Sequence, residues 1–124
     1  MNFQIPDELQ YAASHEWVDR RDEVVRIGIT DFAQDELGDI VFVELPAEGD
    51  TVDRDEAFGL VESIKAISDV YAPVAGTVVE INTAVREQPE LINEHPFEDG
   101  WLIELEPTGE FDHLLEPAEY RAQL

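Results

Sequence analysis

The stretch Gly59-Leu60-Val61-Glu62-Ser63-Ile64-Lys65-Ala66-Ile67-Ser68-Asp69-Val70 lies at the middle of the chain and predicts a β-hairpin. Residues 57–64 alternate in the way that a half-buried strand requires, and a second strand is expected from Ile67 to Val74. Lys65 falls between the two runs, where the tip of the hairpin belongs. The hairpin as a whole is expected to span about residues 56–74.

Lys65 is the only lysine of the chain, and the other six cationic side chains are arginines. An amine can be deprotonated and acylated, whereas a guanidinium stays charged and is a poor nucleophile. An amine held at an exposed turn is suited to being modified and to carrying the attached group between partners, because tethering keeps the group at a high effective concentration. The last lysine of a lysine-poor chain can also lie there by chance, so the flanking sequence has to decide.

Composition bounds the domain count and the partners. A length of 124 residues is typical of one domain, so a single domain over residues 1–124 is expected. The 30 acidic and 7 basic residues give a net charge of −23, from which no basic patch for nucleic acid can be assembled. Self-repulsion of this size destabilises a compact state unless salt screens it, with a Debye length of ~3 Å in molar salt. The composition is therefore typical of adaptation to a salt-rich cytoplasm, and no carboxylate is counted as functional merely for being present.

Several other classes of protein are excluded or disfavoured. The chain has no cysteine, so disulfides and thiolate metal sites are impossible. Residues 1–8 lack the basic region and apolar core of a signal peptide, and no apolar run approaches the ~20 residues that span a bilayer. The three histidines, His15, His95 and His113, lack metal-ligand spacing. We expect a soluble, cytoplasmic protein without a membrane segment or a metal.

Outside the hairpin, many short strands separated by turn signals predict a mainly β barrel or sandwich. The expected strands cover residues 16–19, 24–29, 40–45, 77–82 and 101–106. The segment Pro46-x-x-Gly49-Asp50-Thr51-Val52 also resembles Pro73-x-x-Gly76-Thr77-Val78, and these two units flank the hairpin. Such a repeat predicts a pseudo-two-fold arrangement of two small sheets.

Three short helices are expected. One runs from Asp31 to Leu37, with Asp31 and Gln34 as a capping box and Gly38 as the stop signal. Pro89 and Pro117 are expected as the first residues of two others, the last of which covers about residues 117–123.

The segment Glu62-Ser63-Ile64-Lys65-Ala66, followed by Ser68 to Gly76, resembles the lipoyl-attachment region of the glycine cleavage system H protein family. Further blocks follow in the family's order: Tyr11-x-x-Ser14-His15-Glu16-Trp17, Ile27 to Gln34, Leu37 to Asp39, Phe42 to Pro46, Pro89-x-Leu91-Ile92-Asn93 and Gly100 to Leu102. The resemblance covers residues 8 to 121, nearly the whole chain. Glu-x-x-Lys-Ala alone would be weak, but this many ordered blocks are specific. The acidic bias is the main departure.

The resemblance implies a barrel-sandwich hybrid of the lipoyl-domain type, with two small antiparallel sheets and short added helices. It implies that Lys65 carries lipoate in amide linkage and that the chain is a carrier rather than an enzyme. In the family, glycine decarboxylase (P protein) loads an aminomethyl group onto a lipoyl sulfur, and an aminomethyltransferase (T protein) passes the one-carbon unit to tetrahydrofolate. Dihydrolipoyl dehydrogenase (L protein) then reoxidises the dithiol. A lipoate-attaching enzyme is a fourth implied partner, and a freely shuttling carrier fits a monomer.

The resemblance also assigns further site residues. The family shields its water-sensitive cargo in a surface cleft, and the matching positions here are Ser14, Glu16 and Asp69. A carboxylate of Glu16 or Asp69 would pair with the protonated amine of the cargo, although both also fit an ordinary acidic surface. Ser14 equally fits a serine that bonds its own backbone. Glu62 is expected to help the attaching enzyme recognise the hairpin, and Gly76 to allow a sharp turn between the sheets.

Other carriers and one enzyme class are alternatives to this interpretation. A biotin carrier would show methionines beside the lysine, where this chain has Ile64 and Ala66. A lipoyl domain of an acyltransferase would continue into a linker and a catalytic domain, whereas this sequence ends at Leu124. A lipoyl carrier or lipoate relay for another 2-oxoacid dehydrogenase-type complex stays open. A small hydrolase lacks support, because no histidine spacing provides it.

Overall fold

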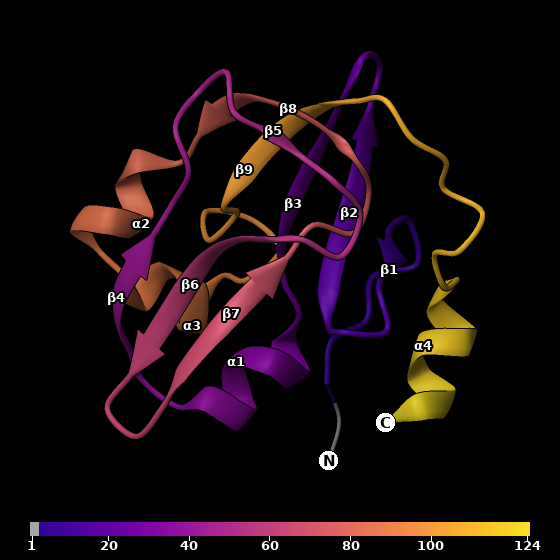
Figure 1. Cartoon of the computed structure of the whole chain (residues 1–124). Coiled ribbons are helices and arrows are strands. Elements are labelled where there is room, and N and C mark those ends of the chain that lie inside the picture. Colours follow the sequence, from indigo (N-terminus) through magenta and orange to yellow (C-terminus); the bar gives the residue numbers. More distant parts are fainter. Residues whose placement is uncertain (1–2) are drawn as a thin grey trace.

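Two antiparallel sheets form the computed structural model, which describes residues 3–124 (Figure 1). The larger sheet has the order β1 (Gln10–Tyr11), β2 (Glu16–Arg21), β3 (Val24–Ile29), β9 (Ile103–Pro107), β8 (Gly76–Ile81) and β5 (Thr51–Val52). The smaller sheet has the order β4 (Ile40–Glu44), β6 (Ala57–Ser63) and β7 (Ile67–Tyr71), and its β6 and β7 lie in front of the larger sheet in Figure 1. Four short helices are added: α1 (Asp31–Leu37), α2 (Thr83–Glu87), α3 (Glu90–Glu94) and α4 (Pro117–Gln123).

The core lies between the inner faces of the two sheets. Val25, Ile27 and Ile29 share one face of β3, as the alternation predicts, and all three are buried. Val61 and Val70 face them from the smaller sheet and belong to the same apolar cluster. The predicted architecture of two small antiparallel sheets with short helices is therefore confirmed.

The β2–β3 hairpin is tighter than predicted. The strand β3 has the expected bounds, but β2 reaches two residues further than expected and ends at Arg21, so that the turn is only Asp22 and Glu23. Asp22 has a φ of 51°, a left-handed conformation that aspartate tolerates better than most residues. The expected end of the first strand at Asp19 is wrong because Arg20 pairs with Val25 across the sheet.

The first helix has the predicted bounds but a different N-cap. The Thr30 hydroxyl accepts the backbone N–H of Ala33, so the cap lies one residue before Asp31. The Asp31 carboxylate instead accepts the side-chain amide of Gln34. The predicted capping box is therefore wrong, whereas the stop at Gly38 is confirmed by its φ of 81° and by the bond from its N–H to the Gln34 carbonyl.

The later helices differ in part from the expectation. Pro117 is the first residue of α4, as predicted, but Pro89 is the N-cap of α3 rather than its first residue. The helix α2 is an addition to the expected elements: Asn82, expected as the end of a strand, instead caps α2 because its side chain accepts the Ala84 N–H.

Other strand ends also differ by one to three residues. The strand expected to reach Val74 ends at Tyr71, two residues before Pro73, which has no N–H to give to a ladder. The strand expected from Trp101 begins at Ile103, and the strand expected to reach Leu45 ends at Glu44.

The two copies of the internal repeat pair with each other in one sheet and do not form two separate sheets. Thr51 lies opposite Thr77 and Val52 opposite Gly76, so that both units belong to the larger sheet. The Gly49 N–H bonds to the Val78 carbonyl at 2.7 Å, and the Val78 N–H returns to the Asp50 carbonyl at 2.8 Å. The local two-fold relation exists, but the smaller sheet is built from β4, β6 and β7.

Within residues 3–124, no helix is long and apolar enough to cross a membrane. The same part of the chain has no cluster of three or more histidine, aspartate or glutamate side chains placed to hold a metal.

Gly76 is the first residue of β8 and lies opposite Pro107 at the end of β9, and this close contact gives a stability prediction. A Cβ at Gly76 would lie 2.6 Å from the Glu106 carbonyl oxygen and 3.2 Å from Cα of Pro107, both backbone atoms that cannot rotate away. Gly76→Ala is therefore expected to lower the free energy of unfolding by about 2 kcal/mol, measured by urea unfolding in molar salt. Val79→Ala, at an exposed position of the same strand, should stay within about 0.5 kcal/mol. Equal stability of the two variants would show that the strands separate without cost.

Candidate functional site

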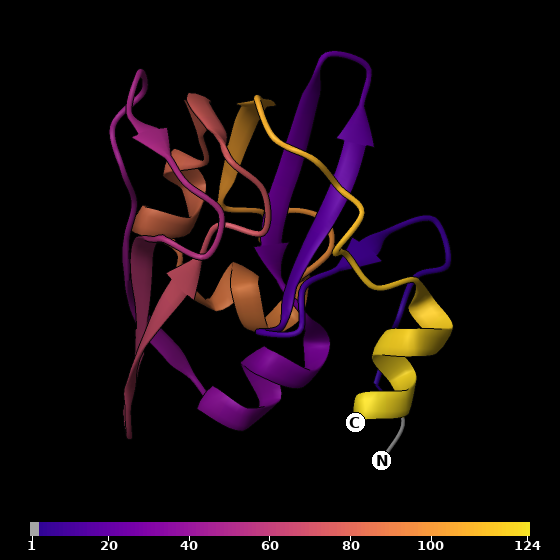
Figure 2. The same cartoon turned by 45° about the vertical axis from the view of Figure 1, so that its right-hand side comes forward.

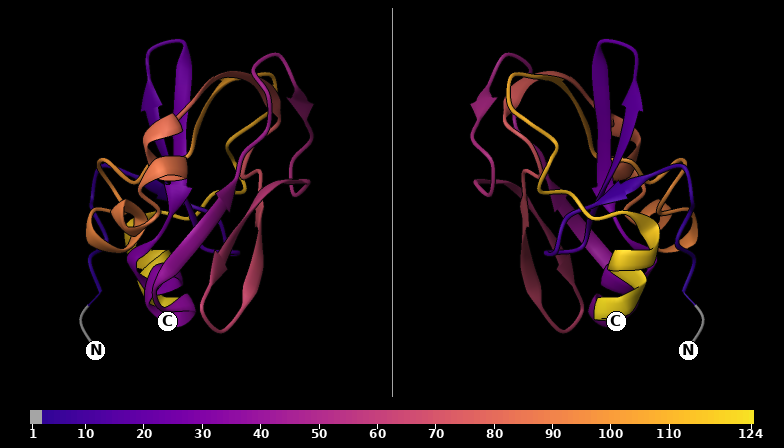
Figure 3. Two further views of the ribbon diagram at one scale, coloured as in Figure 1. Left: turned by 90° about the vertical axis from the view of Figure 1, so that its left-hand side faces the viewer. Right: turned by 90° about the vertical axis from the view of Figure 1, so that its right-hand side faces the viewer.

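Lys65 lies at the exposed tip of the β6–β7 hairpin. The tip, α1 and the C-terminal end of α4 lie at one end of the molecule in every view (Figures 1 to 3). Ser63 builds the turn: its buried hydroxyl accepts the N–H of Lys65 at 3.3 Å and of Ala66 at 3.1 Å. Its own N–H bonds to the Ala66 carbonyl at 2.8 Å. The N–H groups of Lys65 and Ala66 are thus satisfied within the turn, and the lysine side chain is left free to project.

The hairpin tip rests on the corner between α1 and β4. The Ile64 N–H bonds to the Asp39 carbonyl at 3.3 Å. The stem of Lys65 passes over Gly38, with Cε 3.7 Å from the point where a Cβ on that glycine would lie. Among residues 3–124 the ion pairs are Arg21–Asp19, Arg26–Glu104 and Arg54–Asp55, and none of them engages Lys65. The amine is therefore presented from a supported turn and is not held by a carboxylate of the described chain.

Glu16 is a buried carboxylate at the junction of the two sheets, with 2% of its surface exposed. Its Oε2 accepts the backbone N–H of Tyr71 at 3.2 Å, which ties β2 to the end of β7. Its Oε1 accepts the hydroxyl of Ser14. Burial raises the pKa of Glu16 to about 7, against the opposing effect of these two donors. Near neutral pH the group therefore populates both the acid and the carboxylate.

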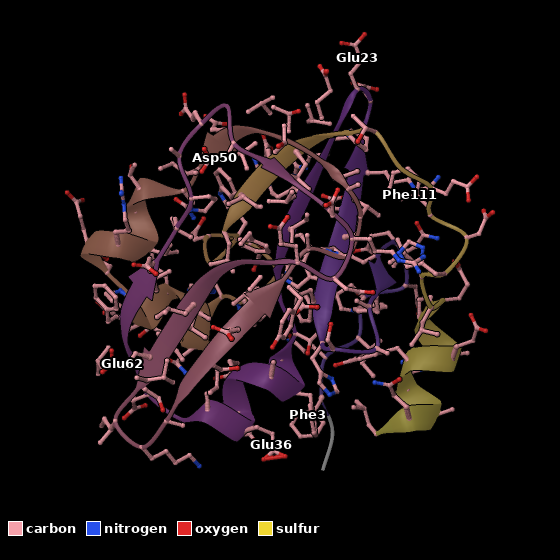
Figure 4. The ribbon with its side chains drawn as sticks, in the orientation of Figure 1. Phe3, Glu23, Glu36, Asp50, Glu62 and Phe111 are labelled. Carbon is pink, nitrogen blue, oxygen red and sulfur yellow. The ribbon has the colours of Figure 1, made fainter. Side chains whose placement is uncertain are left out.

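The structure brings two of the three predicted cleft residues into contact. Ser14 bonds the side chain of Glu16, so the alternative that it serves only its own backbone is wrong. Asp69 lies on β7 opposite Leu60, and its exposed side chain is on the outer face of the smaller sheet. Glu62 lies on the same face, at the end of β6 that is close to the tip (Figure 4).

A hollow of about 260 Å³ opens beside Ser14. Its lining also includes Ala12, Ala13, Arg54, Asp55, Pro73 and His113. The His113 ring donates from Nε2 to the Pro73 carbonyl at 2.6 Å, and Arg54 lies 3.7 Å from the Asp55 carboxylate. No sequence motif points to Arg54 or His113, because only the folded chain places them beside this hollow. A larger hollow of about 610 Å³ beside residues 4–9 contains none of the predicted site residues.

The C-terminal helix holds the segment that carries Ser14 and Glu16. Nδ1 of His15 is hydrogen-bonded to the Tyr120 hydroxyl at 2.8 Å. The same hydroxyl is hydrogen-bonded to the Thr30 hydroxyl at 2.7 Å. His15 has a φ of 79°, and the Gln123 side chain donates to the Ala13 carbonyl at 3.0 Å. Burial lowers the pKa of His15 and raises that of Tyr120 to about 12, so both are neutral near pH 7. These contacts fix His15, and with it the chain between Ser14 and Glu16, against the C-terminal helix.

Comparison with known proteins agrees with this geometry. Residues 9–124 match the family model described as "Glycine cleavage H-protein". Two proteins called "Probable glycine cleavage system H protein", from Natronomonas pharaonis and Haloarcula marismortui, are 55% and 56% identical over 100% of this chain and 99% of each relative. A crystal structure of a glycine cleavage system H protein from Mycobacterium marinum has a TM-score of 0.90 and 44% identity, covering 96% of this chain and 98% of that one. The chain therefore belongs to the glycine cleavage H-protein family, and the similarity to proteins of halophilic archaea agrees with its acidic composition.

The buried carboxylate of Glu16 gives a pH prediction. Because the pKa is about 7 in the folded chain against an ordinary value of 4.5, folding favours the protonated form. The stability that the protonated group contributes is present below pH 4.5 and is lost as the pH rises through 7. Glu16→Gln keeps the shape without the charge. The free energy of unfolding of this variant minus that of the wild type should therefore rise by up to about 3 kcal/mol between pH 4.5 and pH 8.

Urea unfolding in molar salt at a series of pH values measures this difference. Glu48→Gln, at an exposed carboxylate, is the control and should run parallel to the wild type. Parallel curves for Glu16→Gln as well would mean that Glu16 titrates as an ordinary surface carboxylate.

Proposed function

We propose that this chain is the lipoyl-bearing shuttle of the glycine cleavage system, with lipoate attached through an amide to Lys65. The observation that carries the proposal is a lone lysine at the exposed tip of a braced hairpin. The residues present fit the group, because the amine is accessible and the tip amides are already satisfied by Ser63. Lipoate bound there supplies a disulfide that takes up and releases a one-carbon amine.

Ser14 and Glu16 are the residues that would receive the cargo. The Glu16 carboxylate is desolvated and fixed by two donors, and a protonated amine placed against it forms a charge-assisted hydrogen bond in a site of low water content. Asp69 adds a second negative charge near the hairpin, on the exposed side of β7. The chain's own part is to bind, orient and shield, and we assign the bond-making steps to its partners.

The partners follow from the same assignment. As a member of the family, the chain works with the P, T and L proteins of the system, which are glycine decarboxylase, aminomethyltransferase and dihydrolipoyl dehydrogenase. A lipoate-attaching enzyme acts before them, with Glu62 as a recognition element beside the tip and Gly76 as the backbone contact that sets the sheet geometry. The dense negative surface fits a monomeric carrier in a salt-rich cytoplasm.

Replacing the lysine tests the attachment directly. Lys65→Arg keeps the charge but removes the acylatable amine, so it should gain no lipoyl mass increment and should support no glycine cleavage with the three partner proteins. Intact-mass analysis and a glycine-dependent assay measure the two effects, and circular dichroism should show an unchanged fold. Because no other lysine exists, a retained increment or retained activity would refute the assignment.

Glu16→Gln tests the cargo site. Removing the charge weakens the bond to the protonated amine, so isolated loaded protein should lose its cargo to water about tenfold faster. The release of free formaldehyde with time measures this rate near pH 8, where Glu16 of the parent is ionised. Glu48→Gln is the matched control, and equal rates in the two variants would remove Glu16 from the cargo site.

A further inference from the structure

Large apolar side chains gather around the hairpin tip. Within residues 3–124, five of the seven exposed large hydrophobic residues belong to the smaller sheet or its tip. They are Val41, Phe42, Ile64, Ile67 and Tyr71, with exposed fractions of 53%, 51%, 77%, 66% and 38%. In a chain with 30 acidic residues, such a concentration beside the functional lysine marks an interaction surface.

The strand register arranges these side chains in a row. Phe42 lies opposite Glu62, and Glu62 lies opposite Ile67, so all three share the outer face of the smaller sheet. A β-bulge between Ile40 and Phe42 leaves Val41 exposed as well. The exposed Phe42, Ile64 and Ile67, named here the tip stripe, therefore run beside Lys65.

Carboxylates alternate with the apolar side chains. Glu62 lies between Phe42 and Ile67, and the next row across the sheet is Glu44, Leu60 and Asp69. This pattern fits a partner that presents apolar pockets flanked by basic groups. Salt screens the charged contacts but leaves the apolar ones in place, so the tip stripe is the durable part of the surface at high ionic strength.

We propose that the tip stripe is the docking seat of the enzyme that acylates Lys65, which rests on the proposed function. That enzyme must bring an activated acyl carbonyl within bonding distance of Nζ, and to do so it must cover the adjoining Ile64 and Ile67. The neutral amine attacks the carbonyl carbon of an acyl adenylate; the C–N bond forms, the C–O bond to the nucleotide phosphate breaks, and the amine gives up one proton. An enzyme that acts at the far end of the finished arm has no such need to touch the tip.

Serine variants of the tip stripe test this assignment. Phe42→Ser and Ile67→Ser should each raise the KM for acylation about tenfold with little change in kcat, because exposed docking residues contribute to binding rather than to the chemical step. The probe is a purified lipoate–protein ligase with lipoate and ATP, and intact mass reports the product. Val79→Ser, at a 40% exposed position on β8 of the other sheet, is the matched control and should stay within about twofold.

Two further measurements fix the interpretation. Phe42→Leu keeps the apolar area and should restore nearly the parent KM, and unfolding curves should show that every variant folds. Unchanged KM values in both serine variants would overturn the proposal. The proposal would also be overturned if the serine variants were acylated normally and pre-loaded variants showed a raised KM only in glycine decarboxylation. The tip stripe would then be the docking site of the decarboxylase. Failure of the proposed function is distinct: the parent chain itself would not be acylated, or Lys65→Arg would gain the same mass.

Discussion

The side-chain amide of Asn93 fixes the corner on which the hairpin stands. Its oxygen accepts the Ile40 N–H at 2.9 Å, and its nitrogen donates to the Gly38 carbonyl and to the Gln34 side chain, each at 2.9 Å. One residue of α3 thereby joins the end of α1 to the start of β4. Because the Ile64 N–H and the Lys65 stem both contact this corner, the three hydrogen bonds of the Asn93 side chain help to set the position of the amine.

The acidic surface and the candidate site differ in the exposure and the kind of their side chains. Only three ion pairs occur among the described residues, so most carboxylates face solvent without a cation and rely on salt for screening. Folding is therefore carried by the apolar core between the sheets. Three features depart from this acidic surface: a buried carboxylate without an ion pair at Glu16, the single lysine Lys65, and exposed apolar side chains beside that lysine.

The sequence predicted what depends on local pattern. The strands of the hairpin, the bounds of α1 and the start of α4 follow from alternation, from Gly38 and from Pro117. The cap at Thr30 was missed because Thr30 and Asp31 both suit that position and tertiary contacts choose between them. The family resemblance pointed to Ser14 and Glu16, but no pattern in one sequence reports that Glu16 is buried or that its partner is the amide of Tyr71. Likewise Arg54 and His113, from two loops far apart in the sequence, line the same hollow only in the folded chain.

Glu16 links cargo binding to protonation in the proposed function. A protonated amine placed beside this carboxylate favours its ionised form, which lowers the pKa from about 7 and releases a proton from the fraction that was protonated. The desolvation that destabilises the empty charged site is then offset by the incoming positive charge, so the site is better matched to the loaded carrier than to the empty one. Below pH 7 the amine has to displace that proton before it can pair, and its retention weakens accordingly. The same burial that makes Glu16 costly to the fold thus makes it selective for a cationic cargo, because a neutral group placed there would leave the charge unpaired.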